Sequence, residues 1–132
     1  KINNDSIEIP SFEIDLSLSQ KAEDKLANDK ETVVVTASFF GEAKSTPNQE
    51  GPITLTYSKI ELTKNRNVIF KNIKFSKALY DSLLNKNIWV IVDVASGRKS
   101  INENFLDTDI LEEDVSKVIN KKFNLTGKLI GE

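Results

Sequence analysis

The sequence predicts a mainly β protein, an antiparallel two-sheet β-sandwich of the immunoglobulin or transthyretin-like type with two or three short helices in its connections. Short segments of the chain alternate apolar and polar side chains, and this period of two is typical of strands with one buried face. Segments with strand character outnumber those with helical character, and turn-forming residues separate them. This balance favours antiparallel layers over a doubly wound parallel sheet.

The length of the chain, 132 residues, suits one domain. A domain of this size buries enough surface to form a core without disulfides. We expect residues 1–6 to be a polar tether and residues 7–132 to form a single sandwich domain. Because the chain does not begin with Met, either a leader before Lys1 has been removed or the sequence has been shortened, and we expect the former.

The N-terminal part predicts two strands with a helix between them. Alternation over residues 12–18 indicates the first strand, and the parity of the apolar residues changes at Pro10, which predicts a kink or bulge there. Ser19 is placed to cap a helix that ends near Asn28. Residues 32–40 then form a strand, whose consecutive valines indicate burial on both faces.

The middle of the chain predicts a loop followed by a hairpin. Gly, Pro, Ser, Thr and Asn are frequent at residues 41–52, which is typical of a loop. Residues 53–62 and 68–75 are predicted to pair as two strands of a hairpin. The apolar parity slips between Tyr57 and Ile60, and this slip predicts a bulge in the first of them.

The C-terminal part predicts two more helices and two more strands. Ser76 is placed to cap a helix that ends near Asn85. Residues 88–94 form the most hydrophobic strand, which we expect at the centre of a sheet. A third helix is predicted at residues 110–120, with its apolar residues on one side, and a final strand at residues 123–129.

The chain lacks Cys, His and Met altogether. Without Cys and His, the Ser-His-Asp and Cys-His nucleophile systems are excluded, as are the usual zinc and copper sites. A net charge of −2 and a pI of about 5.3 argue against nucleic acid as a partner, because that binding depends on a basic surface. No apolar run is long enough to be a transmembrane segment. We therefore expect no catalytic residues and no cofactor.

Four residues are candidates for ligand binding. The rings of Tyr57 and Trp89 could stack on a carbohydrate, although each also fits a core or half-buried position. Asp93, within the hydrophobic strand, could act as an acid or base, or it could pair with Arg98. The guanidinium of Arg98 is suited to a carboxylate or to another anion.

An acidic segment near the C-terminus offers weak candidates for calcium ligands, Asp107 and Asp109. Glu112 stands where the calcium loop of an EF-hand needs Gly. The stronger interpretation is structural, with Asp109 as a helix N-cap and Glu112 completing a capping box.

Ser96 and Lys99 have the Ser-x-x-Lys spacing of penicillin-binding proteins and related acylases. That chemistry also needs Ser-Asp-Asn and Lys-Thr-Gly elements, which the sequence lacks. We interpret the segment as a turn around Gly97.

The layout of the chain combines the polar segment at residues 1–6, a helix directly after the first long strand, and the sandwich pattern. This layout resembles the transthyretin-like domains of bacterial envelope lipoproteins, including the small lipoproteins of secretion machines. The resemblance implies an exported protein, either periplasmic or anchored to the outer membrane by a lipid attached before Lys1. We expect a non-catalytic binding or assembly domain whose partner is a protein.

Two alternatives remain open. The first is a small-ligand or glycan-binding module that uses Trp89 or Tyr57. The second is an enzyme, which would have to work with carboxylates, Lys or Ser alone.

Overall fold

The structure, a computed structural model, describes residues 5–43 and 51–132. Strands account for 58% of it and helices for 14%, which confirms the mainly β class. The strands are β1 (Ser6–Ile9), β2 (Phe12–Leu18), β3 (Val33–Ala43), β4 (Pro52–Leu62), β5 (Asn67–Phe70), β6 (Ile73–Ser76), β7 (Leu83–Ser96), β8 (Leu106–Thr108), β9 (Leu111–Asp114) and β10 (Lys122–Leu129). The helices are α1 (Gln20–Asn28), α2 (Lys77–Asp81) and the 3₁₀ helix η1 (Val115–Lys117).

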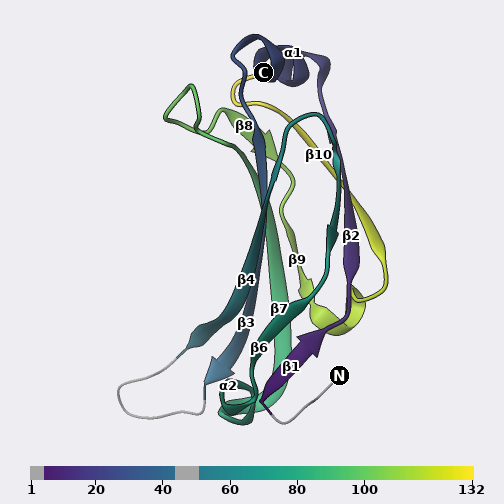
Figure 1. Ribbon diagram of the computed structural model, residues 1–132, viewed down its shortest axis with the longest axis vertical. Helices are drawn as coiled ribbons and strands as arrows, with labels where there is room; N and C mark the ends of the chain where they lie inside the picture. Colours follow the sequence, from purple (N-terminus) through teal and green to yellow (C-terminus); the bar gives the residue numbers. More distant parts are fainter. Residues whose placement is uncertain (1–4, 44–50) are drawn as a thin grey trace.

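Two four-stranded sheets pack against each other along the length of the molecule (Figure 1). One sheet has the strand order β5-β2-β10-β8, and the other has the order β4-β3-β7-β9. Their inner faces share one core, in which Phe12 of β2 meets Phe39 of β3 edge to face with ring centroids 6.2 Å apart. The predicted packing of sheets is therefore present. The predicted number of sheets was wrong, because the described residues form three.

The third sheet, formed by β1 and β6, prolongs the ladder between β2 and β5. Ile9 pairs with Ile73 on one side of an interruption, and Phe12 pairs with Phe70 on the other, in one continuous antiparallel register. Pro10 lies at this interruption, where its ring removes the backbone donor that a ladder needs. The buried positions change parity at the same point, where the strand is interrupted between Ile9 and Phe12.

Strands β2 and β10 run parallel, with Leu16 opposite Leu125. The prediction of wholly antiparallel sheets was therefore wrong for this pair. Only Asp109 and Ile110 separate β8, which pairs with β10, from β9, which pairs with β7. The chain thus crosses between layers here, as strands do at the corners of sandwiches.

The first two helices begin where the sequence predicts. The Ser19 hydroxyl accepts a hydrogen bond from the Ala22 backbone N–H at 3.1 Å, and Leu26 is buried beneath α1. Ser76 caps α2 in the same way. This helix is shorter than predicted because Leu83, fully buried, is already the first residue of β7.

The prediction of a third helix at residues 110–120 was wrong. Leu111–Asp114 is strand β9, which pairs with β7, and only the short η1 follows it. Asp114 caps η1 by accepting a hydrogen bond from the Ser116 backbone N–H at 2.9 Å, so the capping role given to Asp109 was also wrong. Among the described residues, no helix has the length and apolar character needed to cross a bilayer.

The predicted hairpin was wrong as well. Strand β4 pairs with β3 while β5 pairs with β2, so the connection between β4 and β5 passes from one layer to the other. The bulge in β4 lies at Leu55, between Thr54 and Thr56, instead of between Tyr57 and Ile60.

Parts of two predicted segments lie outside the described residues, namely 1–4 of the tether and 44–50 of the loop. Ser6 already belongs to β1, while Gly41 and Pro52 belong to β3 and β4. The tether itself stays a prediction.

Candidate functional site

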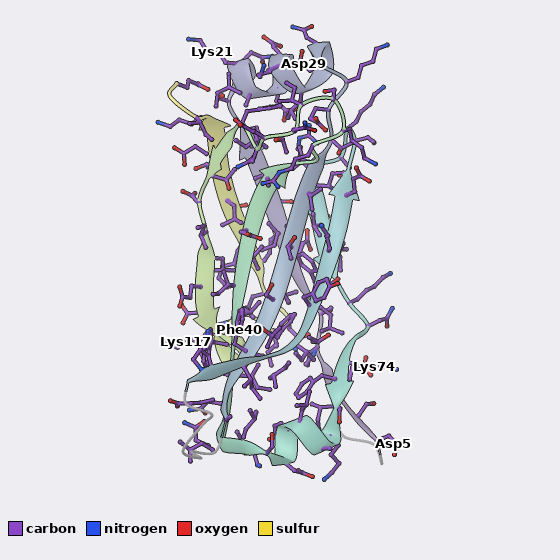
Figure 2. The ribbon with its side chains drawn as sticks, turned by 90° about the vertical axis from the view of Figure 1, so that its left-hand side faces the viewer. Asp5, Lys21, Asp29, Phe40, Lys74 and Lys117 are labelled. Atoms are coloured by element: carbon purple, nitrogen blue, oxygen red, sulfur yellow. The ribbon has the colours of Figure 1, made fainter. Side chains whose placement is uncertain are left out.

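The outer face of the β4-β3-β7-β9 sheet, which Figure 2 views directly, carries three of the four residues predicted to bind a ligand. Tyr57 lies opposite Ser38, and Ser38 lies opposite Ile91. Trp89 precedes Ile91 by two residues along β7, and Asp93 follows it by two. Because side chains alternate along a strand, Trp89, Ile91 and Asp93 all point to this face.

Aromatic and apolar side chains gather on one half of this face. The rings of Phe40 and Trp89 stack with centroids 5.9 Å apart and planes 25° apart. Both rings are half-buried, as is Ile91, and Tyr57 on the neighbouring strand is 66% exposed. We call these four residues (Tyr57, Phe40, Trp89 and Ile91) the outer patch. It leaves apolar surface open to solvent across three adjacent strands.

The outer face of the opposite four-stranded sheet is held by charged and polar contacts. Lys122 Nζ lies 2.8 Å from an Asp15 carboxylate oxygen, and Asn67 donates a hydrogen bond to Glu13 at 2.6 Å. The hydrogen bond from Lys122 is the main cause that keeps the pKa of Asp15 below its usual range. Polar contacts thus hold part of this face, on which Ile69 is also exposed, whereas the outer patch gathers aromatic side chains.

The other half of the outer face is polar and encloses a hollow of about 250 Å³. Its lining includes Lys59, Asp93 and Arg98, together with Val34 and Thr36 of β3. Asp93 forms no ion pair with Arg98 or with any other cation of the described chain. Both charged groups can therefore reach a ligand placed in this hollow.

A buried carboxylate fixes the segment that carries Arg98. Glu31 is 6% exposed, and its carboxylate accepts hydrogen bonds from three consecutive backbone N–H groups, those of Lys99 at 2.9 Å, Ser100 at 3.0 Å and Ile101 at 3.3 Å. Burial raises the pKa of Glu31, but the amide donors outweigh it and lower the pKa to about 2. The carboxylate thus stays charged and orders the loop.

The ordered segment, residues 97–101, is called the Glu31 loop below. It needs glycine at its first position, because a Cβ on Gly97 would lie 1.9 Å from the Thr32 hydroxyl oxygen. Sequence reasoning found the turn at Gly97 and missed Glu31. A single acidic residue between a helix and a strand gives no signal that its carboxylate will be buried.

The Ser-x-x-Lys spacing does not form a nucleophilic pair. Ser96 is 2% exposed, and its hydroxyl accepts a hydrogen bond from the Phe105 backbone N–H at 3.1 Å. Lys99 Nζ instead lies 3.4 Å from a Glu61 carboxylate oxygen. Ser96 therefore has no exposed hydroxyl with which to attack a substrate.

The calcium candidates lie away from the outer patch, beside a hollow of about 250 Å³ between β8 and β10. The Asp109 carboxylate accepts hydrogen bonds from the Thr126 backbone N–H at 3.0 Å and the Thr126 hydroxyl at 2.9 Å. These bonds lower the pKa of Asp109. Asp107 lines the same hollow with Lys128. Within residues 5–43 and 51–132, no three acidic side chains gather as a metal site would require.

Another hollow, of about 460 Å³, lies between α1 and the connection from β4 to β5. Leu26 and Ala27 contribute apolar lining. Arg66 binds both carboxylate oxygens of Glu23, at 2.7 and 2.9 Å, so its guanidinium is already engaged. None of the residues predicted as site residues lines this hollow.

Sequence reasoning missed Phe40 as a member of the outer patch. The consecutive valines of β3 led to the prediction that both faces are buried, but only Val33 and Val35 are, while Val34 is half-buried. The signal that could have found Phe40 is its position next to Phe39. Neighbouring residues of a strand face opposite sides, so one of these two rings had to point outward.

Comparison with known proteins finds no match to this chain. No family model matches it, and neither does any curated protein or solved structure.

Proposed function

We propose that the chain is a non-catalytic binding domain whose partner is a protein and whose binding surface is the outer patch. One observation carries the proposal: the stacked rings of Phe40 and Trp89, the half-buried Ile91 and the exposed Tyr57 all lie on the outer face of three adjacent strands. Exposed apolar patches with a polar surround are typical of protein-binding sites. Aromatic residues are also enriched among the residues that contribute most to such interfaces.

The surroundings of the patch fit a protein partner. Lys59 and Asp93 follow it along the strands on one side, and Glu112 and Asp114 of β9 lie opposite Ile91 and Trp89. Polar groups around an apolar centre are the usual arrangement of an interface.

The test is site-specific photo-crosslinking in cells that produce the protein. A photoreactive residue in place of Tyr57 should give a discrete adduct with one partner protein. The matched control is the same residue in place of Ile69, which is 50% exposed on β5 of the opposite sheet. Equal adducts from both positions, or none from position 57, would contradict the proposal.

The purified partner then allows a quantitative test. Trp89 is the only tryptophan of the chain, so its fluorescence reports binding at the patch directly. Replacing Tyr57 with Ser should weaken binding at least about tenfold. Its exposed position predicts little change in unfolding free energy, roughly 0.5 kcal/mol or less.

A glycan or small ligand is the second candidate, favoured by the exposed ring of Tyr57 beside the hollow that Asp93 and Arg98 line. An aromatic ring beside a few convergent polar groups is a common arrangement of small-ligand sites. A change of Trp89 fluorescence on adding oligosaccharides, lost in Tyr57→Ser, would favour this candidate over a protein.

We also propose, from the sequence layout, that the sandwich is of the immunoglobulin or transthyretin-like type and that the protein belongs to the bacterial cell envelope. The helix directly after the first long strand supports the resemblance. Fractionation of cells that produce the protein tests the location. Recovery in the cytoplasm alone would contradict it.

A further inference from the structure

The outer edge of β4 differs from the other three edges of the two large sheets. Strand β4 has 11 residues, whereas β5 and β9 have 4 each and β8 has 3. Long exposed edges present unpaired backbone N–H and C=O groups, and proteins usually shorten, bend or charge them. The length of β4 therefore calls for an explanation.

The two halves of this edge are not equivalent. The bulge at Leu55 disturbs the first half. Strand β6 also contacts β4. The second half, residues 58–62, pairs regularly with β3 on its inner side. Within the described residues, its backbone makes no hydrogen bond on the open side.

The side chains of this half are complementary to themselves. Lys59 and Glu61 point to the outer face, and Ile60 between them points inward, where it is half-buried against the core. If two copies pair antiparallel with Ile60 opposite Ile60, each Lys59 lies opposite a Glu61. Lys59 forms no ion pair within the described part of the chain, so this partner would be its first.

The same charges exclude the neighbouring registers. A shift by two residues again sets outer side chains opposite outer ones, but it places Lys59 opposite Lys59, or Glu61 opposite Glu61. Like charges directly opposite each other destabilise a ladder. A shift of half that size would set the outer side chains of one copy against the inner ones of the other. An edge lysine commonly prevents pairing. Here Glu61 of the second copy lies opposite Lys59, so the edge lysine forms a specific contact.

From these observations we propose that two copies of the chain associate through β4, with residues 58–62 of each forming an antiparallel ladder. The contact has a two-fold axis at Ile60, so each surface meets its own copy. It joins two four-stranded sheets into one of eight strands. Both outer patches then lie on the same side of the continuous sheet, and both Ile60 side chains gain cover.

The other edges do not offer this contact. Strand β9 carries Glu112, Glu113 and Asp114 in succession, so self-pairing would place acidic residues opposite one another. Strands β5 and β8 are too short for a comparable ladder. The proposal therefore assigns the contact to β4 alone.

Sedimentation velocity across a range of protein concentrations measures the monomer–dimer equilibrium. The test compares variants in which the charges at positions 59 and 61 are reversed singly or exchanged. The wild-type chain should form dimers within concentrations up to about 1 mM. Lys59→Glu should weaken the dimer about tenfold, because two equivalent pairs change from attraction to repulsion. Glu61→Lys should act in the same direction. The double variant Lys59→Glu/Glu61→Lys should restore the dimer.

Two controls keep the test decisive. Glu61 also accepts a hydrogen bond from the Thr32 hydroxyl at 2.7 Å and lies 3.4 Å from Lys99 Nζ, so thermal unfolding of each variant verifies the fold, and Lys59→Glu carries the test without these contacts. Lys21→Glu, an exposed charge reversal on α1 and outside β4, should leave association unchanged. A monomeric wild-type chain at all concentrations, or a dimer insensitive to the charge exchange, would overturn the proposal.

Discussion

Glu31 is a charged residue that the fold removes from water and still keeps ionised. Its carboxylate accepts hydrogen bonds from the backbone of Lys99, Ser100 and Ile101, and also from the Thr32 backbone N–H at 3.0 Å. Hydrogen bonds to a charged group are stronger than those between neutral groups. The side chain therefore offsets its own desolvation by ordering a loop distant in sequence.

The pH dependence of stability should report this arrangement. The pKa of Glu31 is about 2 in the folded chain against an ordinary value of 4.5. Between these values the unfolded chain binds more protons, so the free energy of unfolding falls as the pH decreases from about 5 to about 2. Glu31 should account for up to about 3 kcal/mol of this fall. Urea unfolding followed by Trp89 fluorescence measures it.

The variant Glu31→Gln isolates the contribution of this one carboxylate. It should be less stable than the wild type by about 2 kcal/mol at neutral pH, and the difference should shrink as the pH approaches 2. Glu103→Gln, an exposed change close in sequence to the same loop, is the control and should follow the wild-type curve. Parallel curves for wild type and Glu31→Gln would show that the amide donors do not hold the charge.

At the scale of elements, local patterns predicted strands well and their partners poorly. Alternation correctly located β2, β7 and β10, because burial on one face leaves a period of two in the sequence. The β-branched and aromatic residues of β3 located that strand. The choice of partner depends on contacts between distant segments, and sequence alternation contains no information on these. The hairpin between β4 and β5 was therefore wrong although both strands exist.

The third helix shows how a helical pattern can be overridden. Leu111, Val115, Val118 and Ile119 have helical spacing, and Asp109 with Glu112 has the spacing of a capping box. Helix propensity is a weak preference, and tertiary contacts commonly outweigh it. Here β9 supplies backbone partners to β7, which would otherwise be a long open edge.

Likewise, the candidate site was predictable in part. Tyr57 and Trp89 were chosen for their chemistry, and the register of the sheet brings them onto one face. The Glu31 loop was not predictable, because it depends on a carboxylate and a segment about 70 residues apart meeting in the fold.

The end of α1 gives a prediction about backbone conformation. The Glu31 backbone N–H donates to the Leu26 carbonyl at 2.8 Å, and the Lys30 N–H donates to the Ala27 carbonyl at 3.2 Å, as in a Schellman motif. Lys30 occupies the left-handed position of this motif, with a φ of 53°. Glycine adopts that conformation without the steric cost of a side chain.

Replacing Lys30 with Gly should therefore stabilise the protein by roughly 0.5–1 kcal/mol. Lys21→Gly, the same substitution within the first turn of α1, should destabilise it by a similar amount. Chemical unfolding of both variants checks the opposite signs. Equal losses of stability would mean that the helix end does not require the left-handed conformation.

Over the whole molecule, the fold is closed by strands from opposite ends of the chain. Strand β10 lies between β2 and β8, so the last strand is internal to its sheet (Figure 1). Leu125 of β10 is buried in the core. Strand β10 pairs with both β2 and β8, so the sheet that contains β2 is incomplete until the end of the chain has been made. Pairing between segments so distant in sequence slows folding.

A chain that ends at Asn120 should consequently fail to fold as a unit. It loses β10, which leaves β2 without its parallel partner and β8 without any partner in its sheet. Circular dichroism and thermal unfolding should show no cooperative transition, because the apolar face of the opposite sheet loses its cover. The control removes only Gly131 and Glu132. It deletes the hydrogen bond from the Ser19 hydroxyl to Glu132 but keeps every strand, and should unfold cooperatively. A cooperative transition in the chain ending at Asn120 would mean that the other strands form a self-sufficient core and that the sandwich is not a single folding unit.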